Sequence, residues 1–344
     1  MANGCVTASP YIMAPGPTAA SRPWASTRLG GDEQTLKLFV AVTDGDWFRF
    51  LSGQEGLDEV NFWQPGGGRD FVALTLGAPF LFKLRWPENA IVGGGFFAKS
   101  TRLPVSIVWE VFGQKNGAAT YAAMRSRIER LRRARPSPQE DYEIGCIVLE
   151  DPFFLPRDRW IPAPSDFSKP VVVGKGYDLS TAAGKELWES VLEARAATIH
   201  AGAERASRIE GATYGKAQGG RVRLHQGAFR VMVTDAYSRR CAISGEKALP
   251  VLQAAHIQPV SEGGQHRLDN GLLLRSDVHT LFDRGYITVT PDRRIHVSRK
   301  LKDDFDNGEP YLPFNGRQID VPRAPNEQPA PKFLEWHADT VFRG

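Results

Sequence analysis

Residues 241–289 constrain the fold more than any other part of the chain, because they place three polar residues at fixed points of one regular pattern. The apolar runs VLQAAHI and GLLLR predict two short strands, and Ser276 is suited to cap a helix directly after them. His256 ends the first strand, Asn270 opens the second, and His279 lies on the helix. We therefore predict a strand, loop, strand and helix that gather these three side chains.

Positive charge and histidine are concentrated around this unit. Residues 201–300 contain sixteen Lys and Arg and nine Asp and Glu, a net charge of +7, whereas the other 244 residues carry −3 of the chain's total of +4. Five of the seven histidines lie in the same window. A basic, histidine-rich segment favours an anionic partner, with nucleic acid the leading candidate, and a solvated surface is the alternative.

The motifs of this unit resemble those of the HNH endonuclease family, whose fold is a ββα-metal unit. They are AAHI-x-P around His256, NGLLL beginning at Asn270 and HTLFDRG beginning at His279, and the resemblance spans roughly residues 221–299. It implies a divalent metal, Mg²⁺ or Mn²⁺, bound by His279, and hydrolysis of DNA phosphodiester bonds. It also implies that His256 is the general base, a role that suits an imidazole with a pKa near 6.5, and that Asn270 braces the loop and orients the base.

One position departs from the family pattern. Ala255 stands where many HNH enzymes carry an acidic or histidine metal ligand. Asp283 lies one helical turn after His279 on the same face, so it is a candidate second ligand, and stabilisation of the helix end is its alternative role. Cys241 is one of only three widely spaced cysteines, so we expect no structural zinc.

Other polar residues of the segment have less specific surroundings. Arg275 and Arg284 are candidates to contact DNA phosphates, and a solubilising surface role is the alternative. His266 falls within the loop between the two strands, so we expect it at the surface or against a phosphate rather than in catalysis.

Short β-rich runs separated by Gly, Pro and Asn fill the chain from Leu36 onward. The runs are LKLFVAV, DFVALTL, PFLFKLRW, AIVGGGFF, SIVWEVF and YEIGCIVL. Before the last of them, apolar residues at helical spacing predict a helix that carries Arg125, Arg127, Arg130, Arg132, Arg133 and Arg135. This arginine strip is either a solvated face or a surface that binds phosphates.

These β-rich runs resemble the PUA-like superfamily, which includes ASCH and EVE-like domains. The resemblance implies a β-barrel that binds nucleic acid and holds an extruded base; EVE-like readers joined to HNH nucleases recognise modified cytosine. Aromatic and amide side chains suit such a pocket, and we name Trp47, Asn61, Trp63 and Gln64 as base-binding candidates. Trp63, in the loop-like sequence NFWQPGGG, is expected to be exposed; the alternative is that these aromatics form the core.

We thus predict an α+β protein with four parts. These are a disordered extension (1–35), a PUA/EVE-like β-barrel reader with helices (36–165), a helical connector (166–220) and an HNH nuclease domain (221–344), with further strands at RVMVT, YITVT and RIHVS. No apolar run approaches the ~20 residues of a membrane helix and no secretory signal is evident, so we expect a cytoplasmic protein.

The expected function is modification-dependent restriction of double-stranded DNA that carries modified cytosine. One nuclease site per chain suggests a homodimer for duplex cleavage. Two alternatives stay open: a toxin or mobile-element nuclease whose first domain binds another ligand, and a nucleic-acid-binding protein whose HNH site is inactive.

Overall fold

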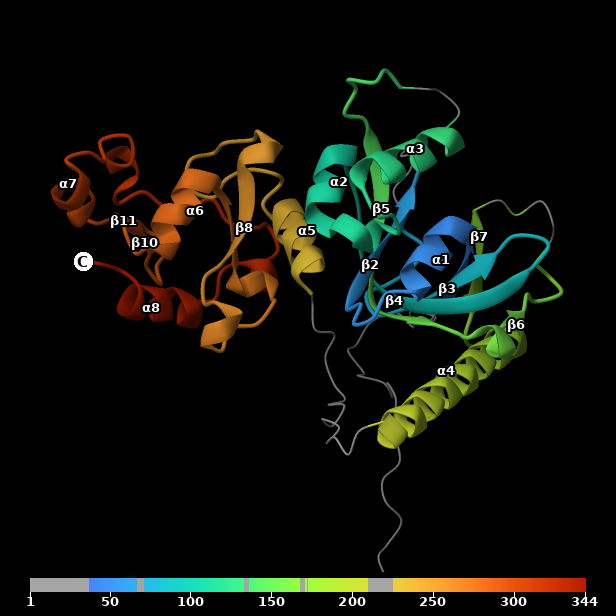
Figure 1. The fold of residues 1–344 in the computed structure, drawn as a ribbon. Coiled ribbons are helices and arrows are strands. Elements are labelled where there is room, and N and C mark those ends of the chain that lie inside the picture. The colour runs from blue at the N-terminus through green and yellow to red at the C-terminus, as the bar shows by residue number, and fades with distance from the viewer. Residues whose placement is uncertain (1–36, 67–70, 133–135, 168–170, 172, 210–224) are drawn as a thin grey trace, which may run out of the picture. The chain divides into compact units, whose positions relative to one another are not determined.

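A sheet of seven strands organises the first half of the computed structural model (Figure 1). Its strand order is β2-β5-β4-β3-β1-β7, with β6 paired to β4. Strands β1 and β3 run parallel, and the other neighbours are antiparallel. The structure describes residues 37–66, 71–132, 136–167, 171, 173–209 and 225–344, the side chains of 202–209 excepted; the predicted N-terminal extension, Arg133 and Arg135 lie outside them.

The elements of this half alternate between strands and short helices. In chain order they are β1 (Lys37–Thr43), α1 (Gly45–Ser52), β2 (Glu59–Gln64), β3 (Pro79–Leu84), β4 (Ala90–Pro104), α2 (Val105–Phe112), η1 (Gly113–Asn116), α3 (Tyr121–Leu131), β5 (Glu143–Phe154), η2 (Arg157–Arg159), β6 (Ile161–Pro162), β7 (Gly174–Asp178) and α4 (Ala182–Ile209).

Both faces of the sheet are buried, because successive side chains of a strand point to opposite sides. In β3, Phe80 and Phe82 pack into the core shared with α1, α2 and α3, whereas Leu81 packs into a second core. Helix α4 closes that second core with Leu187 and Trp188. The residues of β3 are consequently all buried, as expected for a central strand covered on two sides.

The predicted α+β class is confirmed, but the β-barrel expected for the first half is not closed among the described residues. Within the described residues the sheet is open, with β2 and β7 as its outer strands and no pairing between them. Helix α4 packs its apolar side chains against the face of the sheet that carries Leu81. That face is therefore buried although the sheet does not close into a barrel.

Three of the predicted strands are also wrong. Residues 106–112 belong to helix α2, residues 230–234 belong to helix α5 (Gln226–Ala236), and residues 71–76 form no strand. The first two runs are rich in Val and Ile because both helices are buried on more than one side, and a short apolar run does not distinguish a buried helix from a strand.

The C-terminal half contains the predicted strand, loop, strand and helix. Strand β8 pairs antiparallel with β9, and α6 follows β9 directly. Helix α6 begins at Ser276 as predicted, but no side chain caps it, so the capping role assigned to Ser276 is wrong. The elements are η3 (Leu249–Val251), β8 (Leu252–His256), η4 (Val260–Glu262), η5 (Leu268–Asn270), β9 (Gly271–Arg275), α6 (Ser276–Asp283), β10 (Ile287–Val289), β11 (Ile295–Val297), α7 (Lys300–Phe305), η6 (Leu312–Phe314), η7 (Pro325–Glu327) and α8 (Pro331–Thr340).

Helix α5 contributes to two cores. Ala228 and Val231 pack into the main core of the first sheet, whereas Phe229 and Val233 pack into the core around β8, β9 and α6. At 3.6 residues per turn these two pairs lie on different faces of the helix. All described residues belong to one compact unit, and no helix among them is long and apolar enough to cross a membrane.

Candidate active site

His256 ends strand β8 opposite Gly271 of β9. Its imidazole is half-buried and stacks on the Phe229 ring of α5, with ring centroids 3.9 Å apart and planes 9° apart. Burial, followed by the nearby positive charge of His266 and His279 when they are protonated, lowers the pKa of His256 to about 4. The ring is therefore neutral at neutral pH and able to accept a proton.

His266 is the partner of His256 that sequence reasoning missed. Its Nδ1 lies 2.9 Å from Nε2 of His256, and its ring also contacts Phe229. Burial lowers the pKa of His266 as well. Its place in a Gly-rich loop gave no sign of this contact, because the contact forms only when the loop folds back over the end of β8.

Asn270 fixes the loop that begins after His256 and carries His266. Its amide Nδ2 donates to the carbonyl oxygens of Gln258 (2.9 Å) and Gln265 (3.0 Å), and its Oδ1 accepts from the backbone N–H of Gln258 (2.9 Å). The side chain is fully buried. One amide thus satisfies three backbone groups of the loop.

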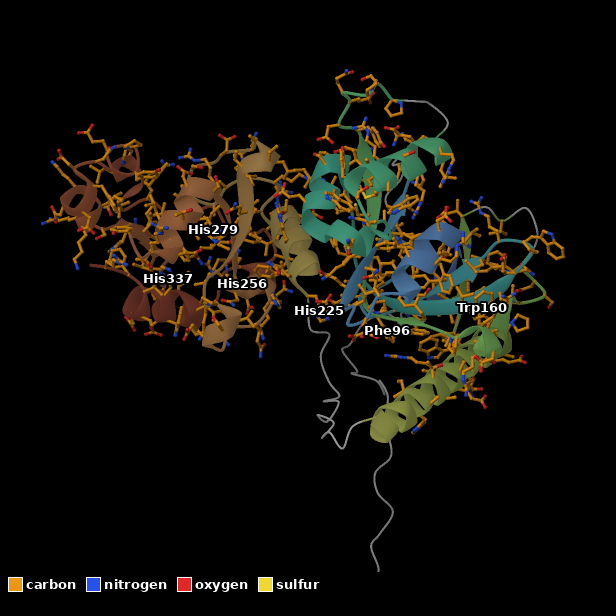
Figure 2. All side chains as sticks on the ribbon, viewed as in Figure 1. Phe96, Trp160, His225, His256, His279 and His337 are labelled. Carbon is orange, nitrogen blue, oxygen red and sulfur yellow. The ribbon has the colours of Figure 1, made fainter. Side chains whose placement is uncertain are left out.

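His279 and Asp283 face each other one turn apart on α6. Nε2 of His279 lies 3.3 Å from Oδ2 of Asp283, and Nδ1 of His279 lies 2.7 Å from Oε1 of Gln253. If Nδ1–H donates to this oxygen, Nε2 keeps its lone pair beside the carboxylate. His256 and His279 both lie in the C-terminal half, as Figure 2 shows.

An imidazole nitrogen and a carboxylate fit a divalent cation that keeps several other oxygen ligands, as Mg²⁺ does. Among the described residues, no group of three or more His, Cys, Asp or Glu side chains is arranged to hold a metal. Ala255 is fully buried in the core and supplies no ligand. The pair of His279 and Asp283 offers one nitrogen and one carboxylate to such a cation.

The two arginines named from the sequence differ in their surroundings. Arg275 donates twice to the Asp277 carboxylate, at 2.6 and 2.8 Å, which lowers the pKa of Asp277 to about 2. Arg284, directly after α6, is exposed. Arg284 is accordingly the more accessible of the two to a phosphate.

The structure buries three of the four predicted base-binding residues in the first half. Trp63 is 6% exposed and its indole N–H donates to the Asn116 carbonyl, so the expectation of an exposed Trp63 is wrong. Trp47 is also buried and donates to the carbonyl oxygen of Asn61. Gln64, at the end of β2, is partly exposed.

Asn116 is the centre of this buried polar cluster, and the sequence did not indicate it. Its Oδ1 accepts from the Asn61 amide at 2.8 Å, and its Nδ2 donates to the carbonyl oxygens of Val108 and Gly113. These bonds satisfy the Asn61 and Asn116 amide N–H groups inside the core, while Oδ1 of Asn61 has no hydrogen-bond partner among the described residues.

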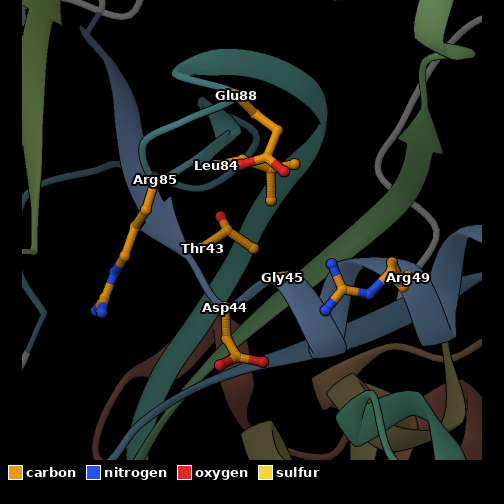
Figure 3. Close-up of a pocket in the computed structure, with 7 residues that line it drawn as sticks. All are labelled: Thr43, Asp44, Gly45, Arg49, Leu84, Arg85 and Glu88. Carbon is orange, nitrogen blue, oxygen red and sulfur yellow. The ribbon is translucent and has the colours of Figure 1, made fainter.

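A pocket opens at a different place in the first half, where the C-terminal end of β1 meets α1 and the β3–β4 turn (Figure 3). Its lining consists of Thr43, Asp44, Gly45, Arg49, Leu84, Arg85 and Glu88. In Figure 3 the Glu88 carboxylate lies over Leu84 and Thr43, whereas Arg85 extends away from them.

A family model described as "HNH endonuclease" matches residues 241–290. This match confirms the resemblance drawn from the motifs around His256, Asn270 and His279. No curated protein matches the chain.

Three solved structures that align with this chain do so with low TM-scores. ASCH from Zymomonas mobilis is 11% identical and aligns over 44% of this chain and 94% of its own, with a TM-score of 0.32. A mutant form of that protein is 12% identical and aligns over 45% of this chain and 97% of its own, with a TM-score of 0.31. A structure described as the modification-dependent TagI restriction endonuclease is 15% identical, over 88% of this chain and 81% of its own, with a TM-score of 0.27.

Proposed function

We propose that this chain, an endonuclease with an HNH domain at residues 241–290, is a metal-dependent enzyme that hydrolyses phosphodiester bonds in DNA. Two pairs of side chains carry the proposal. His256 contacts His266, His279 contacts Asp283, and the second pair is near enough to His256 to influence its pKa. The first pair provides a neutral base, and the second provides donors for a divalent cation.

His256 is the general base of this proposal. In the tautomer that serves the reaction, its Nε2–H donates to Nδ1 of His266, so Nδ1 of His256 keeps the lone pair that takes a proton from water. The stacked Phe229 ring and the bond to His266 together hold the imidazole plane. His266 is thus a positioning residue that acts through the base.

His279 and Asp283 would hold the metal, and Asn270 would keep the loop of the base in place. A bound divalent cation supplies Lewis-acid stabilisation of the charge on the scissile phosphate and the leaving oxygen. The contact of His279 Nδ1 with Gln253 would hold the ring so that Nε2 could bind the cation. Arg275 and Arg284 are proposed phosphate contacts at the edge of this site.

We further propose that the enzyme restricts DNA that carries modified cytosine, with residues 36–165 as the reader and a homodimer for duplex cleavage. The support is the resemblance of the first half to PUA-like domains in its sequence and the basic charge of residues 201–300. Since Trp47, Asn61 and Trp63 are buried, the base is expected to bind at another place on the same domain.

The test is plasmid cleavage by the full chain with Mg²⁺ or Mn²⁺, comparing the wild type with His256→Ala and His296→Ala. His296 is an exposed histidine on β11, so its variant is the matched control. We expect at least a 100-fold loss for His256→Ala and none for His296→Ala. Equal rates for both variants would remove His256 as the base.

The same assay tests the reader. Plasmids that are unmodified, or that carry 5-methylcytosine or 5-hydroxymethylcytosine, are compared at equal enzyme concentration. Preferential cleavage of a modified plasmid supports the reader; equal cleavage of all three substrates contradicts modification dependence and leaves the nuclease assignment intact.

A further inference from the structure

His337 lies outside the segment that matches HNH endonucleases, yet it contacts the helix that carries both proposed metal ligands. The match ends at residue 290, whereas His337 belongs to α8. Its side chain is 2% exposed, and its ring stacks on the Phe282 ring of α6 with centroids 3.7 Å apart and planes 14° apart. Figure 2 labels His337 in the same half of the chain as His279. A buried imidazole needs partners for both ring nitrogens, and these partners indicate what the residue does.

The hydrogen bonds of His337 determine which ring nitrogen carries the proton. Nε2 lies 3.1 Å from the carbonyl oxygen of Phe282, which can only accept, so Nε2–H is the donor. Nδ1 therefore accepts from the hydroxyl of Thr288 on β10, at 2.8 Å. The neutral ring thus connects β10 to the last turn of α6.

The end of α6 needs partners from outside the helix, because the carbonyl groups of a last turn have none within it. The Phe282 carbonyl accepts from the N–H of Gly285 at 2.9 Å and from His337. The segment after α8 also contacts this turn, since the N–H of Arg343 donates to the carbonyl oxygen of Gly285 at 2.9 Å. Helix α8 and the residues that follow it therefore hold the C-terminal end of α6.

The two proposed metal ligands depend on this end of α6 to different degrees. His279 lies inside the helix, and its Nδ1 contacts Gln253 of β8 at 2.7 Å. Asp283 is the last residue of the helix, its side chain is 56% exposed, and it directly follows the residue that His337 holds. The place of the Asp283 carboxylate is accordingly the more sensitive of the two to the last turn.

We propose that His337 is a positioning residue of the metal site, whose bond to the Phe282 carbonyl holds the last turn of α6 so that the Asp283 carboxylate stays beside His279. Helix α8 is then a working part of the nuclease, although the matched segment ends before it. This inference rests on the proposed function, because it requires that Asp283 binds the cation.

The experiment measures Mn²⁺ binding by the full chain without DNA, from the electron paramagnetic resonance signal of free Mn²⁺. It compares His337→Met with His337→Gln, because these two side chains are similar in length but only Gln has an N–H group to donate to Phe282. We expect the dissociation constant to rise about 10-fold in His337→Met and by less than about 3-fold in His337→Gln. Rescue by Gln separates the donated hydrogen bond from the packing of the side chain.

Thr288→Val is the matched control, because it removes one buried partner of His337 and leaves the donor to α6. Urea unfolding measures how far each variant is destabilised, and Thr288→Val should bind Mn²⁺ like the wild type even where its stability falls. Equal weakening in His337→Met and Thr288→Val would overturn the inference, since loosening of the core would then explain both. Unchanged binding in His337→Met would overturn it as well.

Asp283→Asn, measured in parallel, separates this failure from that of the proposed function. If Asp283→Asn weakens Mn²⁺ binding and His337→Met does not, only the positioning role of His337 fails. If neither variant weakens Mn²⁺ binding, the proposed metal site fails together with it.

Discussion

Glu59 offers the sharpest test of how the first half supports the nuclease half. This carboxylate is 1% exposed at the start of β2, and its two oxygens accept the backbone N–H groups of Gly227 and Ala228, both at 2.8 Å. These N–H groups belong to the first turn of α5 and have no partner within the helix. Gly227 is required for the approach, because a Cβ there would lie 2.6 Å from Oε1 of Glu59.

Glu59→Ala removes both bonds and leaves the two N–H groups unpaired. Hydrogen bonds to a charged group contribute about 1.5–3 kcal/mol each, and part of this is recovered when water enters the space left by the side chain. Lys115 loses its contact with Glu59 at 3.0 Å but keeps Asp58 at 2.6 Å, so no buried ammonium is left unpaired. We therefore expect the free energy of unfolding to fall by about 3 kcal/mol.

The assay is urea unfolding of the full chain, with Glu110→Ala as the matched control. Glu110 also pairs with a residue of α5, Arg230 at 2.8 Å, but its side chain is 54% exposed, so its removal should cost less than about 1 kcal/mol. Hydrogen exchange should show faster opening of the α5 amides in Glu59→Ala alone. If the two variants differ by less than about 0.5 kcal/mol, the reasoning from burial and geometry is refuted.

Four further outcomes are expected. Because the pKa of His256 is held at about 4, the cleavage rate at saturating Mg²⁺ should stay level from about pH 8 to pH 5.5, and a rate that halves near pH 6.5 whatever the Mg²⁺ concentration would contradict this. Burial also lowers the pKa of His337 to about 4, so the unfolded chain binds more protons than the folded chain between about pH 6.5 and 4. The free energy of unfolding, measured in urea, should therefore fall as the pH falls through this window. A constant free energy of unfolding would exclude this link between the protonation of His337 and stability. Asn270→Ala should cost about 2–3 kcal/mol in unfolding free energy because three backbone groups lose their partner; a loss under 0.5 kcal/mol would mean that the loop does not depend on it. Asp283→Asn should raise the Mn²⁺ concentration needed for half-maximal cleavage about 10-fold or more, and an unchanged requirement would remove it as a ligand.

The placement of the polar residues in the C-terminal half could be predicted from sequence because these residues are close together along the chain. Asn270 directly precedes β9 and His279 lies on α6, the helix that directly follows β9, so local spacing determines the end of β9 and the face of α6 at which they lie. The contact between His256 and His266 could not be predicted in this way, since it depends on the path of the loop that Asn270 holds.

The first half was harder to predict because burial there depends on strands that are distant in sequence. Trp63 precedes a Pro-Gly-Gly-Gly run and reads as a loop residue, yet β2 pairs with β5 so that Trp63 lies opposite Cys146. The reverse holds for Trp86. It continues the apolar sequence run of β3, yet it lies in the turn after that strand and is exposed. In both cases the pairing of strands, rather than local composition, decides exposure.

Helix α5 has a consequence for how such a protein could exchange its parts during evolution. The residues matched to HNH endonucleases begin at Cys241, but the ring stacked on His256 belongs to Phe229, and the opposite face of the same helix fills the core of the first half. A nuclease segment transferred to a new partner without α5 would lose the support of its base. Transferred with α5, it would need a partner that accommodates Ala228 and Val231 and provides a carboxylate at the place of Glu59. Only first domains that can pack against this face of α5 could therefore be joined to this nuclease segment by recombination.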